Sequence, residues 1–131
     1  MEDRYLFKAK IGNGYWTIGF LRCKDNKWYI SNNAGSPFAY EVRPDTICQC
    51  TGLKDKNGKL IWENDVVAYW DTYSTENGYA EADCIGRVVW DAETISFQVT
   101  NRLSAESYEV LDECSVIGNI FDNPELLESE D

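Results

Sequence analysis

The pattern of apolar and polar positions along the chain predicts β-strands rather than helices. Residues 94–100 alternate strictly, with Ile95, Phe97 and Val99 on one side and polar residues on the other. Because a period of two places each set on one face of a strand, this segment is predicted to be a half-exposed strand. Residues 66–70 are apolar on both sides. That pattern predicts a central strand with protein against both faces.

Strand-length segments rich in aromatic and β-branched residues recur along the whole chain, separated by Gly, Asn, Asp or Pro. Such segments are typical of a mainly-β domain built from hairpins. The predicted strands are residues 5–10, 15–23, 27–31, 46–52, 66–70, 85–90, 94–100, 107–111 and 115–121. We expect a single domain over residues 1–131. Within it, Pro44 marks a candidate boundary between subdomains 1–45, an N-terminal β-meander, and 46–131.

Two Asn-Gly pairs indicate turns. Asn57-Gly58 lies between two apolar segments and predicts a tight hairpin. Residues 71–83, which include the second pair, are polar and have no apolar period, so they are predicted to form the longest surface loop of the C-terminal part. This loop is the best candidate for a binding loop. Its candidate residues are Asp71, Tyr73, Glu76, Asn77, Tyr79 and Asp83.

The chain is acidic, with 23 Asp and Glu against 12 Lys and Arg and a formal net charge of −11. A chain of this charge repels phosphate at long range, which argues against nucleic acid as a partner. Acidic residues are concentrated at the C-terminal end. A solvated tail is the expected meaning, and a partner-binding tail is the alternative. The residues concerned are Glu125, Glu128, Glu130 and Asp131.

Other features favour a cytoplasmic protein. No apolar segment approaches the roughly 20 residues that a membrane helix needs. The acidic start at Glu2 and Asp3 lacks the basic and apolar segments of a secretory signal. Five cysteines with no Cys-x-x-Cys pair argue against a disulfide framework and a zinc ribbon. We therefore expect free thiols, with the close pair Cys48 and Cys50 the one place where a metal or a partner could engage two of them.

Two blocks of sequence resemble the YopX family of phage and prophage proteins. They are residues 50–67, CTGLKDKNGKLIWENDVV, and residues 116–127, VIGNIFDNPELL. Residues 86–90, GRVVW, also resemble a middle strand of that family, whereas before Thr46 the likeness is weaker. The resemblance implies a phage-encoded cytoplasmic protein of undefined activity. It supplies no catalytic residue.

The turn at Glu63-Asn64-Asp65 departs from the family pattern, which usually has glycine where this chain has Asn64. Asparagine is the next most tolerant residue for positive φ, so we expect the turn to be kept. Asp65 is expected to accept backbone N–H bonds in the turn rather than to bind metal or act in catalysis. Together with Asn57 and Gly58, these residues are the predicted structural turn residues.

The order of strands and turns after residue 46 also resembles a small SH3-like barrel. The segment Asn123-Pro124-Glu125 supplies a capping residue, a first-turn proline and an acid, which predicts a short C-terminal helix. The predicted fold is therefore mainly β, an N-terminal β-meander followed by an SH3-like barrel and a short helix.

Candidate chemistry is sparse. The chain has no histidine, which removes the commonest general base and the commonest nitrogen ligand for metals. It also lacks a phosphate-binding glycine-rich motif. Asp83, Asp91 and Glu93 flank a predicted strand and could supply an acid and a base, but two acids among 23 often lie close by chance. We therefore expect no enzyme activity and predict no catalytic, cofactor-binding or metal-binding residue.

Three functional hypotheses follow. The preferred one is a non-catalytic protein-binding or regulatory module that engages a host or phage protein through an aromatic-rich β surface or the 71–83 segment, with self-association left open. At least three of the five tryptophans are expected in the core. The second is an acidic decoy that imitates the phosphates of nucleic acid and occupies a host protein. The third, ranked last, is an enzyme that uses carboxylates and a divalent metal.

Overall fold

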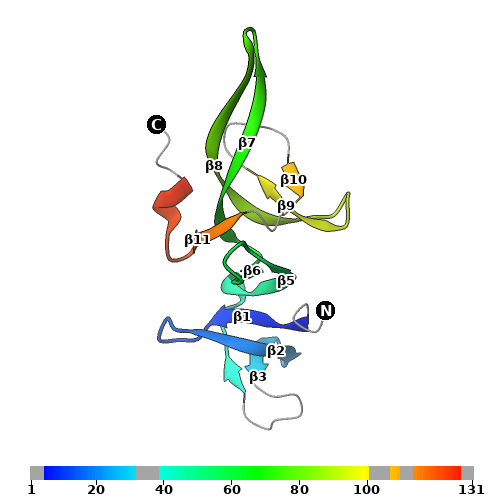
Figure 1. Ribbon diagram of the computed structural model, residues 1–131. Helices are drawn as coiled ribbons and strands as arrows, with labels where there is room; N and C mark the ends of the chain where they lie inside the picture. The colour runs from blue at the N-terminus through cyan, green and yellow to red at the C-terminus, as the bar shows by residue number, and fades with distance from the viewer. Residues whose placement is uncertain (1–4, 32–38, 101–106, 110–113, 128–131) are drawn as a thin grey trace. The chain divides into compact units, whose positions relative to one another are not determined.

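The computed structural model describes residues 5–31, 39–100, 107–109 and 114–127 (Figure 1). The chain divides into two compact units, Met1–Gly52 and Leu53–Asp131, which are described separately below. In the described residues, both units consist of antiparallel strands, with short 3₁₀ turns in place of α-helices. The predicted mainly-β fold is therefore confirmed. None of the helical segments in this part of the chain is long and apolar enough to span a membrane.

The first unit is a meander. Its strands are β1 (Phe7–Lys10), β2 (Trp16–Lys24), β3 (Lys27–Ser31), β4 (Tyr40–Glu41) and β5 (Cys48–Lys54). The strand order of the sheet is β4-β3-β2-β1-β5-β6, and β6 (Leu60–Trp62) already belongs to the second unit. The consecutive hairpins predicted near the N-terminus are present. Strand β5 pairs with β1, although the sequence had grouped it with the C-terminal part.

The predicted break at Pro44 is a 3₁₀ turn inside the first unit, η2 (Pro44–Thr46). Thr46 is fully buried there. Its hydroxyl donates to the carbonyl of Arg43 at 2.7 Å and accepts the N–H of Lys10 at 2.8 Å. Since Lys10 lies in β1, this one side chain fixes the turn to the sheet.

The core of the first unit lies on one face of the sheet. Ala9, Ile30 and Val42 are buried, and they pack against partly buried apolar residues that include Leu21 and Trp28. Alternate residues of a strand point to opposite faces, so the neighbours of these residues along β1 and β2 lie on the other side of the sheet. The core face of this sheet is therefore apolar, whereas the opposite face carries the residues that alternate with the core residues, such as Lys8 and Lys10.

The second unit contains an open sheet. Its strands are β7 (Asp65–Thr75), β8 (Gly78–Asp91), β9 (Ser96–Thr100), β10 (Ser107–Glu109) and β11 (Ser115–Asn119), in the order β10-β9-β8-β7-β11. Strands β10 and β11 are the two edges and are not paired with each other in the described residues. The sheet is therefore not closed, and the predicted SH3-like barrel is not confirmed.

The predicted C-terminal helix is a single 3₁₀ turn, η3 (Pro124–Leu127), within the described residues. The N–H of Leu126 bonds to the carbonyl of Asn123 at 3.1 Å, three residues earlier, which is the bond of a 3₁₀ turn rather than of an α-helix. Glu125 is exposed, as expected for the acidic C-terminal end. Glu128, Glu130 and Asp131 lie outside the described residues.

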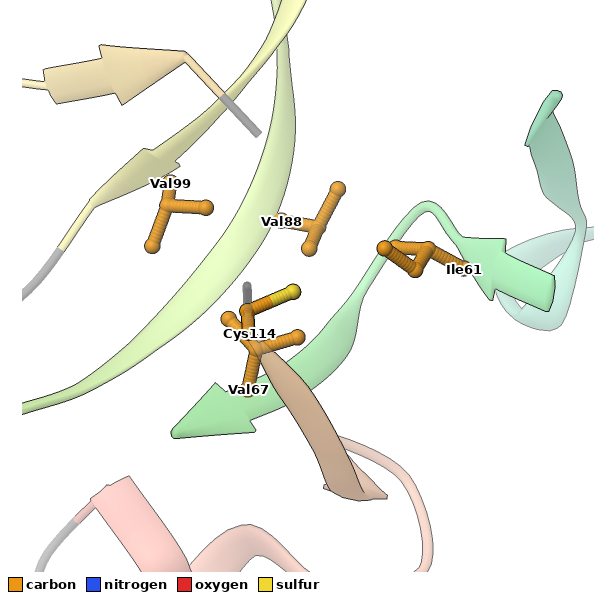
Figure 2. Packing of buried hydrophobic residues seen from close by; sticks show 5 residues of the cluster. All are labelled: Ile61, Val67, Val88, Val99 and Cys114. Atoms are coloured by element: carbon orange, nitrogen blue, oxygen red, sulfur yellow. The ribbon is translucent and has the colours of Figure 1, made fainter. Parts of the chain in front are cut away.

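The second core gathers side chains from four strands and from the residue that precedes β11 (Figure 2). Its buried members are Ile61, Val67, Val88, Val99 and Cys114. The sheet is tightly packed where β8 meets β9, because a Cβ at Gly86 would lie 2.5 Å from a methyl carbon of Val99. Val66 and Val67 are both fully buried, so the start of β7 has protein against both faces, as predicted.

Strand β9 begins later than the alternation suggested. It starts at Ser96, and Ile95 lies in the preceding turn with φ +53°. A positive φ removes Ile95 from the extended alternation, which leaves its side chain 73% exposed. Phe97 and Val99 keep the predicted face and contact the core.

The prediction that residues 71–83 form a surface loop is wrong. This segment is the distal part of the β7–β8 hairpin, in which Thr75 pairs with Gly78 and only Glu76 and Asn77 form the turn (Figure 1). The absence of an apolar period led to the loop prediction. A hairpin needs no apolar period where its faces are not packed in a core, because the ladder of backbone hydrogen bonds forms regardless of side-chain polarity.

Candidate functional site

The turn between β5 and β6 is built around the carboxylate of Asp55. One oxygen, Oδ1, accepts the backbone N–H groups of Asn57 and Lys59, both at 2.9 Å. The N–H of Gly58 donates to the carbonyl of Asp55 at 3.0 Å, and Gly58 has φ +81°. The predicted hairpin at Asn57-Gly58 is therefore confirmed. Asp55 itself was not among the predicted site residues.

The second oxygen of Asp55 reaches a distant strand. Oδ2 accepts the N–H of Val116, in β11, at 2.9 Å. Two further bonds join the same turn to the start of β11, from the N–H of Lys56 to the carbonyl of Cys114 at 3.0 Å and from the side-chain amide of Asn57 to the hydroxyl of Ser115 at 3.2 Å. The carboxylate thus closes a turn and fixes it to a strand that lies 61 residues further along the chain.

These bonds set the charge state of Asp55. The N–H of Val116 lowers the pKa of the carboxyl group most, and the N–H groups of Lys59 and Asn57 lower it further, because all three stabilise the ionised form. Burial acts in the opposite direction, but the net pKa lies below the ordinary value for aspartate. Asp55 is only 5% exposed. It is therefore a buried carboxylate that stays ionised through backbone donors.

The turn before β7 is a second polar junction. Asn64 has φ +72°, which confirms the left-handed conformation expected at this position. Its side-chain oxygen accepts two N–H groups of Arg87, from Nε at 3.2 Å and from Nη2 at 2.9 Å. Asp65 is 2% exposed, and its Oδ2 accepts the N–H of Trp62 at 2.8 Å. Asp65 therefore has the structural role in the turn that the sequence predicted.

The backbone of Asn64 connects three segments. Its N–H donates to the carbonyl of Val88 at 2.8 Å, and its carbonyl accepts the N–H of Ile120 at 3.1 Å. With the side-chain bonds to Arg87, Asn64 contacts β8 twice and the chain after β11 once. A glycine at this position could adopt the same φ and make both backbone bonds, but it could not bind Arg87. The substitution of asparagine for glycine therefore adds an interaction.

The chain after β11 forms a compact polar turn. The side-chain oxygen of Asn119 accepts the N–H groups of Phe121 and Asp122, at 3.0 and 2.9 Å. The side-chain oxygen of Asn123 accepts the N–H of Asn119 at 3.3 Å. A Cβ at Gly118 would lie 2.5 Å from that same oxygen of Asn123, so glycine is required for the close approach. The asparagines and the glycine of residues 116–127 therefore act by shaping the backbone.

The six residues of the candidate binding segment do not converge on one site. Glu76 and Asn77 form the exposed turn of the β7–β8 hairpin. The other four lie in the strands, where Trp70 pairs with Asp83, Asp71 with Ala82, Tyr73 with Ala80 and Ser74 with Tyr79. The side chains of Asp71, Tyr73, Tyr79 and Asp83 lie outside the described residues. A role in binding stays a prediction for all six.

Comparison with known protein families shows that a family model described as "YopX protein" matches residues 3–128. The chain belongs to the YopX family. No curated protein matches the chain. The match covers both sequence blocks that carried the resemblance. In this YopX chain the two blocks meet directly, since Asp55 of the first bonds Val116 of the second and Asn64 of the first bonds Ile120 of the second.

Chemistry is no more evident in the described residues than in the sequence. No group of three or more Cys, Asp or Glu side chains in that part could hold a metal ion. Of the three carboxylates predicted to flank a strand, Asp83 and Asp91 lie within β8, and Asp91 accepts the N–H of Glu93 at 2.9 Å and so closes the exposed β8–β9 turn. The five cysteines are free thiols, and Cys48 and Cys50 are both buried. In the described residues, the YopX motifs form hydrogen-bonded turns.

The tryptophans are more exposed than the sequence led us to expect. Trp62 is buried, with 6% of its side chain exposed, and Trp16 and Trp28 are half-buried. Trp70 is 58% exposed and Trp90 is 45% exposed. Only one of the five tryptophans is thus buried, where at least three were expected in the core. Trp90 contacts Phe97, its partner in the β8–β9 ladder, edge to face with ring centroids 5.1 Å apart. The number of aromatic residues in the sequence does not predict which of their rings are exposed to water.

Proposed function

We propose that this YopX chain is a non-catalytic protein-binding or regulatory module of phage or prophage origin, acting in the cytoplasm of its host cell. The observation that carries the proposal is the exposure of two tryptophans in the sheet of the second unit, Trp70 and Trp90, which the strand register places on opposite faces. Tryptophan is among the residues that contribute most to protein interfaces, where its large ring is removed from water. Family membership is consistent with a phage-type protein and assigns it no activity.

The position of Trp70 supports this role. In the described residues, β11 pairs with β7 as far as Ala68, and β9 pairs with β8 from Arg87 onward. Trp70 lies beyond Ala68 in the β7–β8 hairpin, where its side chain is 58% exposed. A partner could cover this ring.

The proposal is tested by replacing the two exposed tryptophans. The double variant Trp70→Ala/Trp90→Ala should keep the fold and bind a partner purified from infected or lysogenic cells at least about tenfold more weakly, since interface tryptophans commonly contribute about 2 kcal/mol or more. Tyr5→Ala is the matched control, because Tyr5 is 72% exposed and lies in the first unit. Equal binding by the double variant and the wild type would contradict the proposal.

A specific observation also favours the acidic-decoy hypothesis. Residues 53–131 contain eighteen Asp and Glu against five Lys and Arg, so the negative charge of the chain is concentrated in the second unit. A decoy that imitates phosphates would bind a basic host protein, and the affinity should fall steeply as salt rises. Binding through the exposed tryptophans should change little with salt. Affinity measured at low and high salt therefore separates the two.

A further inference from the structure

The charge of the chain is distributed very unevenly between the two units. Residues 1–52 contain seven Lys and Arg against five Asp and Glu, a net charge of +2. Residues 53–131 have a net charge of −13. The formal charge of −11 is therefore the sum of a weakly basic and a strongly acidic part. The first unit by itself therefore carries no excess of negative charge that would repel nucleic acid.

The basic residues of the first unit gather on one face of its sheet. Along β2, Trp16, Ile18 and Phe20 alternate with Thr17 and Gly19, which are buried toward the core. The register of β1 and β2 pairs Lys8 with Ile18 and Lys10 with Trp16, so these lysines share the face of the apolar row. Further along, Arg22 lies opposite Tyr29, and Lys24 lies opposite Lys27.

We call this side of β1, β2 and β3 the basic aromatic face. It holds five cations, Lys8, Lys10, Arg22, Lys24 and Lys27, and one described acid, Glu41, which pairs with Tyr29 at the edge of the sheet. Toward β5 the same face is covered, since Cys48, the residue opposite Lys8, is only 1% exposed. Ser31, opposite Phe20 in β3, is also only 5% exposed, so the accessible part lies mainly along β2, with Lys27 at the start of β3.

The apolar row on this face is exposed in the middle of a strand. Ile18 is 46% and Phe20 39% exposed. The ring of Trp16 has the ammonium nitrogen of Lys8 at 4.7 Å and that of Lys10 at 5.3 Å from its centroid. Large apolar side chains exposed in a row and flanked by cations are informative, because ordinary surface strands carry polar residues there. The face combines flat apolar contacts with positive charge.

We propose that the basic aromatic face binds single-stranded nucleic acid. The bases would stack on Phe20 and contact Ile18, and the phosphates would contact the cations beside them, one strand spacing or about 5 Å away. This combination of a cationic track and stacking side chains is how single strands are bound without sequence preference. An acidic protein would meet the same charges, but it has no flat apolar groups at regular intervals to match the row on β2.

The acidic second unit limits this binding but does not prevent it. Salt screens charge over about 8 Å at physiological ionic strength, so contacts at the face depend mainly on the charges within it. Repulsion from the second unit should lower the association rate and keep the affinity modest. The inference does not depend on the protein-binding role proposed above, which uses other residues in the other unit.

The test uses the full chain and fluorescein-labelled oligothymidylate and oligouridylate of about 20 nucleotides. Fluorescence anisotropy at about 50 mM salt should show saturable binding, with log affinity falling linearly with log salt concentration. No binding by either probe at this salt concentration would overturn the proposal. So would equally tight binding of a duplex of the same length, because a duplex does not expose its bases for stacking.

Matched charge reversals locate the site. Arg22→Glu/Lys27→Glu should lower the affinity at least about tenfold, because each change replaces a phosphate contact by repulsion. Lys54→Glu/Lys56→Glu makes the same change of net charge at exposed lysines at the end of β5 and in the turn that follows it, and should alter the affinity less than about twofold. Equal losses in the two double variants would overturn the proposal, since binding would then follow net charge alone.

Substitutions of Phe20 test whether the bases stack on its ring. Phe20→Ala should lower the affinity for the oligonucleotides about tenfold, and Phe20→Tyr should preserve it, because tyrosine keeps the flat ring. Near-ultraviolet circular dichroism verifies that both variants are folded. Polyglutamate serves as the acidic-polypeptide probe. Binding of polyglutamate as tight as that of the oligonucleotides, with no effect of Phe20→Ala on either, would overturn the proposal in favour of an acidic protein partner.

Discussion

The two Asn-Gly turns of the second unit share a dipeptide and differ in almost everything else. At Asn57-Gly58, the carboxylate of Asp55 accepts two N–H groups of the turn and one from β11. At Asn77-Gly78, Glu76 and Asn77 form the turn of the β7–β8 hairpin, Gly78 pairs with Thr75, and in the described residues the neighbouring strands pair only further down the hairpin. The dipeptide determines where the chain reverses. Whether the reversal is anchored depends on a residue two positions earlier and on a strand far along the sequence.

This difference explains where the YopX sequence blocks act. The first block holds Asp55, Asn57, Gly58, Asn64 and Asp65. The second holds Val116 and Ile120, whose N–H groups donate the long-range bonds to Asp55 and Asn64. The second Asn-Gly turn lies outside both blocks. We infer that the blocks preserve two anchored turns and their contacts with β11 and the chain after it. The surfaces that we propose for binding lie on other residues.

The largest effect is expected from Asp55→Ala. The change leaves three backbone N–H groups, those of Asn57, Lys59 and Val116, without their acceptor. At about 1–3 kcal/mol for each donor left unsatisfied, reduced where water can enter, the free energy of unfolding should fall by about 3 kcal/mol. Urea unfolding followed by circular dichroism measures it.

Asp91→Ala is the control for that experiment. The carboxylate of Asp91 accepts a single N–H, from Glu93, in an exposed turn. Water can replace this bond, so the loss should be less than about 1 kcal/mol. An equal loss in the two variants would mean that the turn at Asp55 is no better anchored than an ordinary surface turn.

Asp65→Ala should have the next largest effect. Asp65 is 2% exposed, and the substitution removes the acceptor of the Trp62 N–H beside the core residue Ile61. The expected loss is about 2 kcal/mol in the free energy of unfolding. Asp65→Asn keeps one oxygen that can accept the bond and should lose less than the alanine variant. The reverse order would argue against the hydrogen-bonding role of Asp65.

Substitutions at Asn64 separate its backbone from its side chain. Asn64→Ala must place an alanine at φ +72° and also loses both bonds to Arg87, so the expected loss is about 1.5 kcal/mol. Asn64→Gly loses the bonds but adopts this φ freely, and its loss should stay within about 1 kcal/mol. Thermal or urea unfolding of the two variants side by side gives the difference. Equal losses would show that the conformation of the turn has no energetic role.

The smallest effect compares the two glycines directly. Gly58 and Gly78 have φ +81° and +117°, and a Cβ would have open space at both. Gly58→Ala should therefore lower the free energy of unfolding by about 1 kcal/mol through backbone strain alone. Gly78→Ala should lower it by less than about 0.5 kcal/mol, because the tip of the hairpin can open without unfolding the sheet. A larger effect at Gly78 would contradict the contrast between the turns.

The sequence predicted the elements and the local turns well. The meander of the first unit, the Asn57-Gly58 hairpin, the positive φ of Asn64 and the role of Asp65 all follow from local propensity or turn chemistry. The 71–83 segment was misread because its strands lack an apolar period, and β9 was predicted to begin at Thr94, two residues before its start at Ser96. In both segments, the conformation of the backbone depends on pairing with a neighbouring strand. The local pattern of apolar and polar residues does not predict that pairing.

The role of Asp55 in its turn could have been predicted from the sequence, but its bond to Val116 could not. Asp55 stands two residues before Asn57, the spacing at which an aspartate side chain accepts a backbone N–H in a turn. Its bond to Val116 joins residues 61 positions apart and depends on how β11 pairs with β7. The closed barrel was predicted from the order of strands, which does not fix whether the edge strands of the sheet meet.

The titration of Asp55 tests whether its ionised carboxylate joins the two YopX blocks. In the folded protein its pKa is lowered, so its contribution to stability is present above the ordinary aspartate pKa of about 3.9 and is lost as the pH falls through the folded value. Carboxyl carbon chemical shifts, followed by nuclear magnetic resonance across this range, should give a midpoint for Asp55 clearly below 3.9, with the Val116 amide shifting at the same midpoint. A midpoint at or above 3.9, with the Val116 amide unaffected, would show that this carboxylate does not hold the two YopX blocks together.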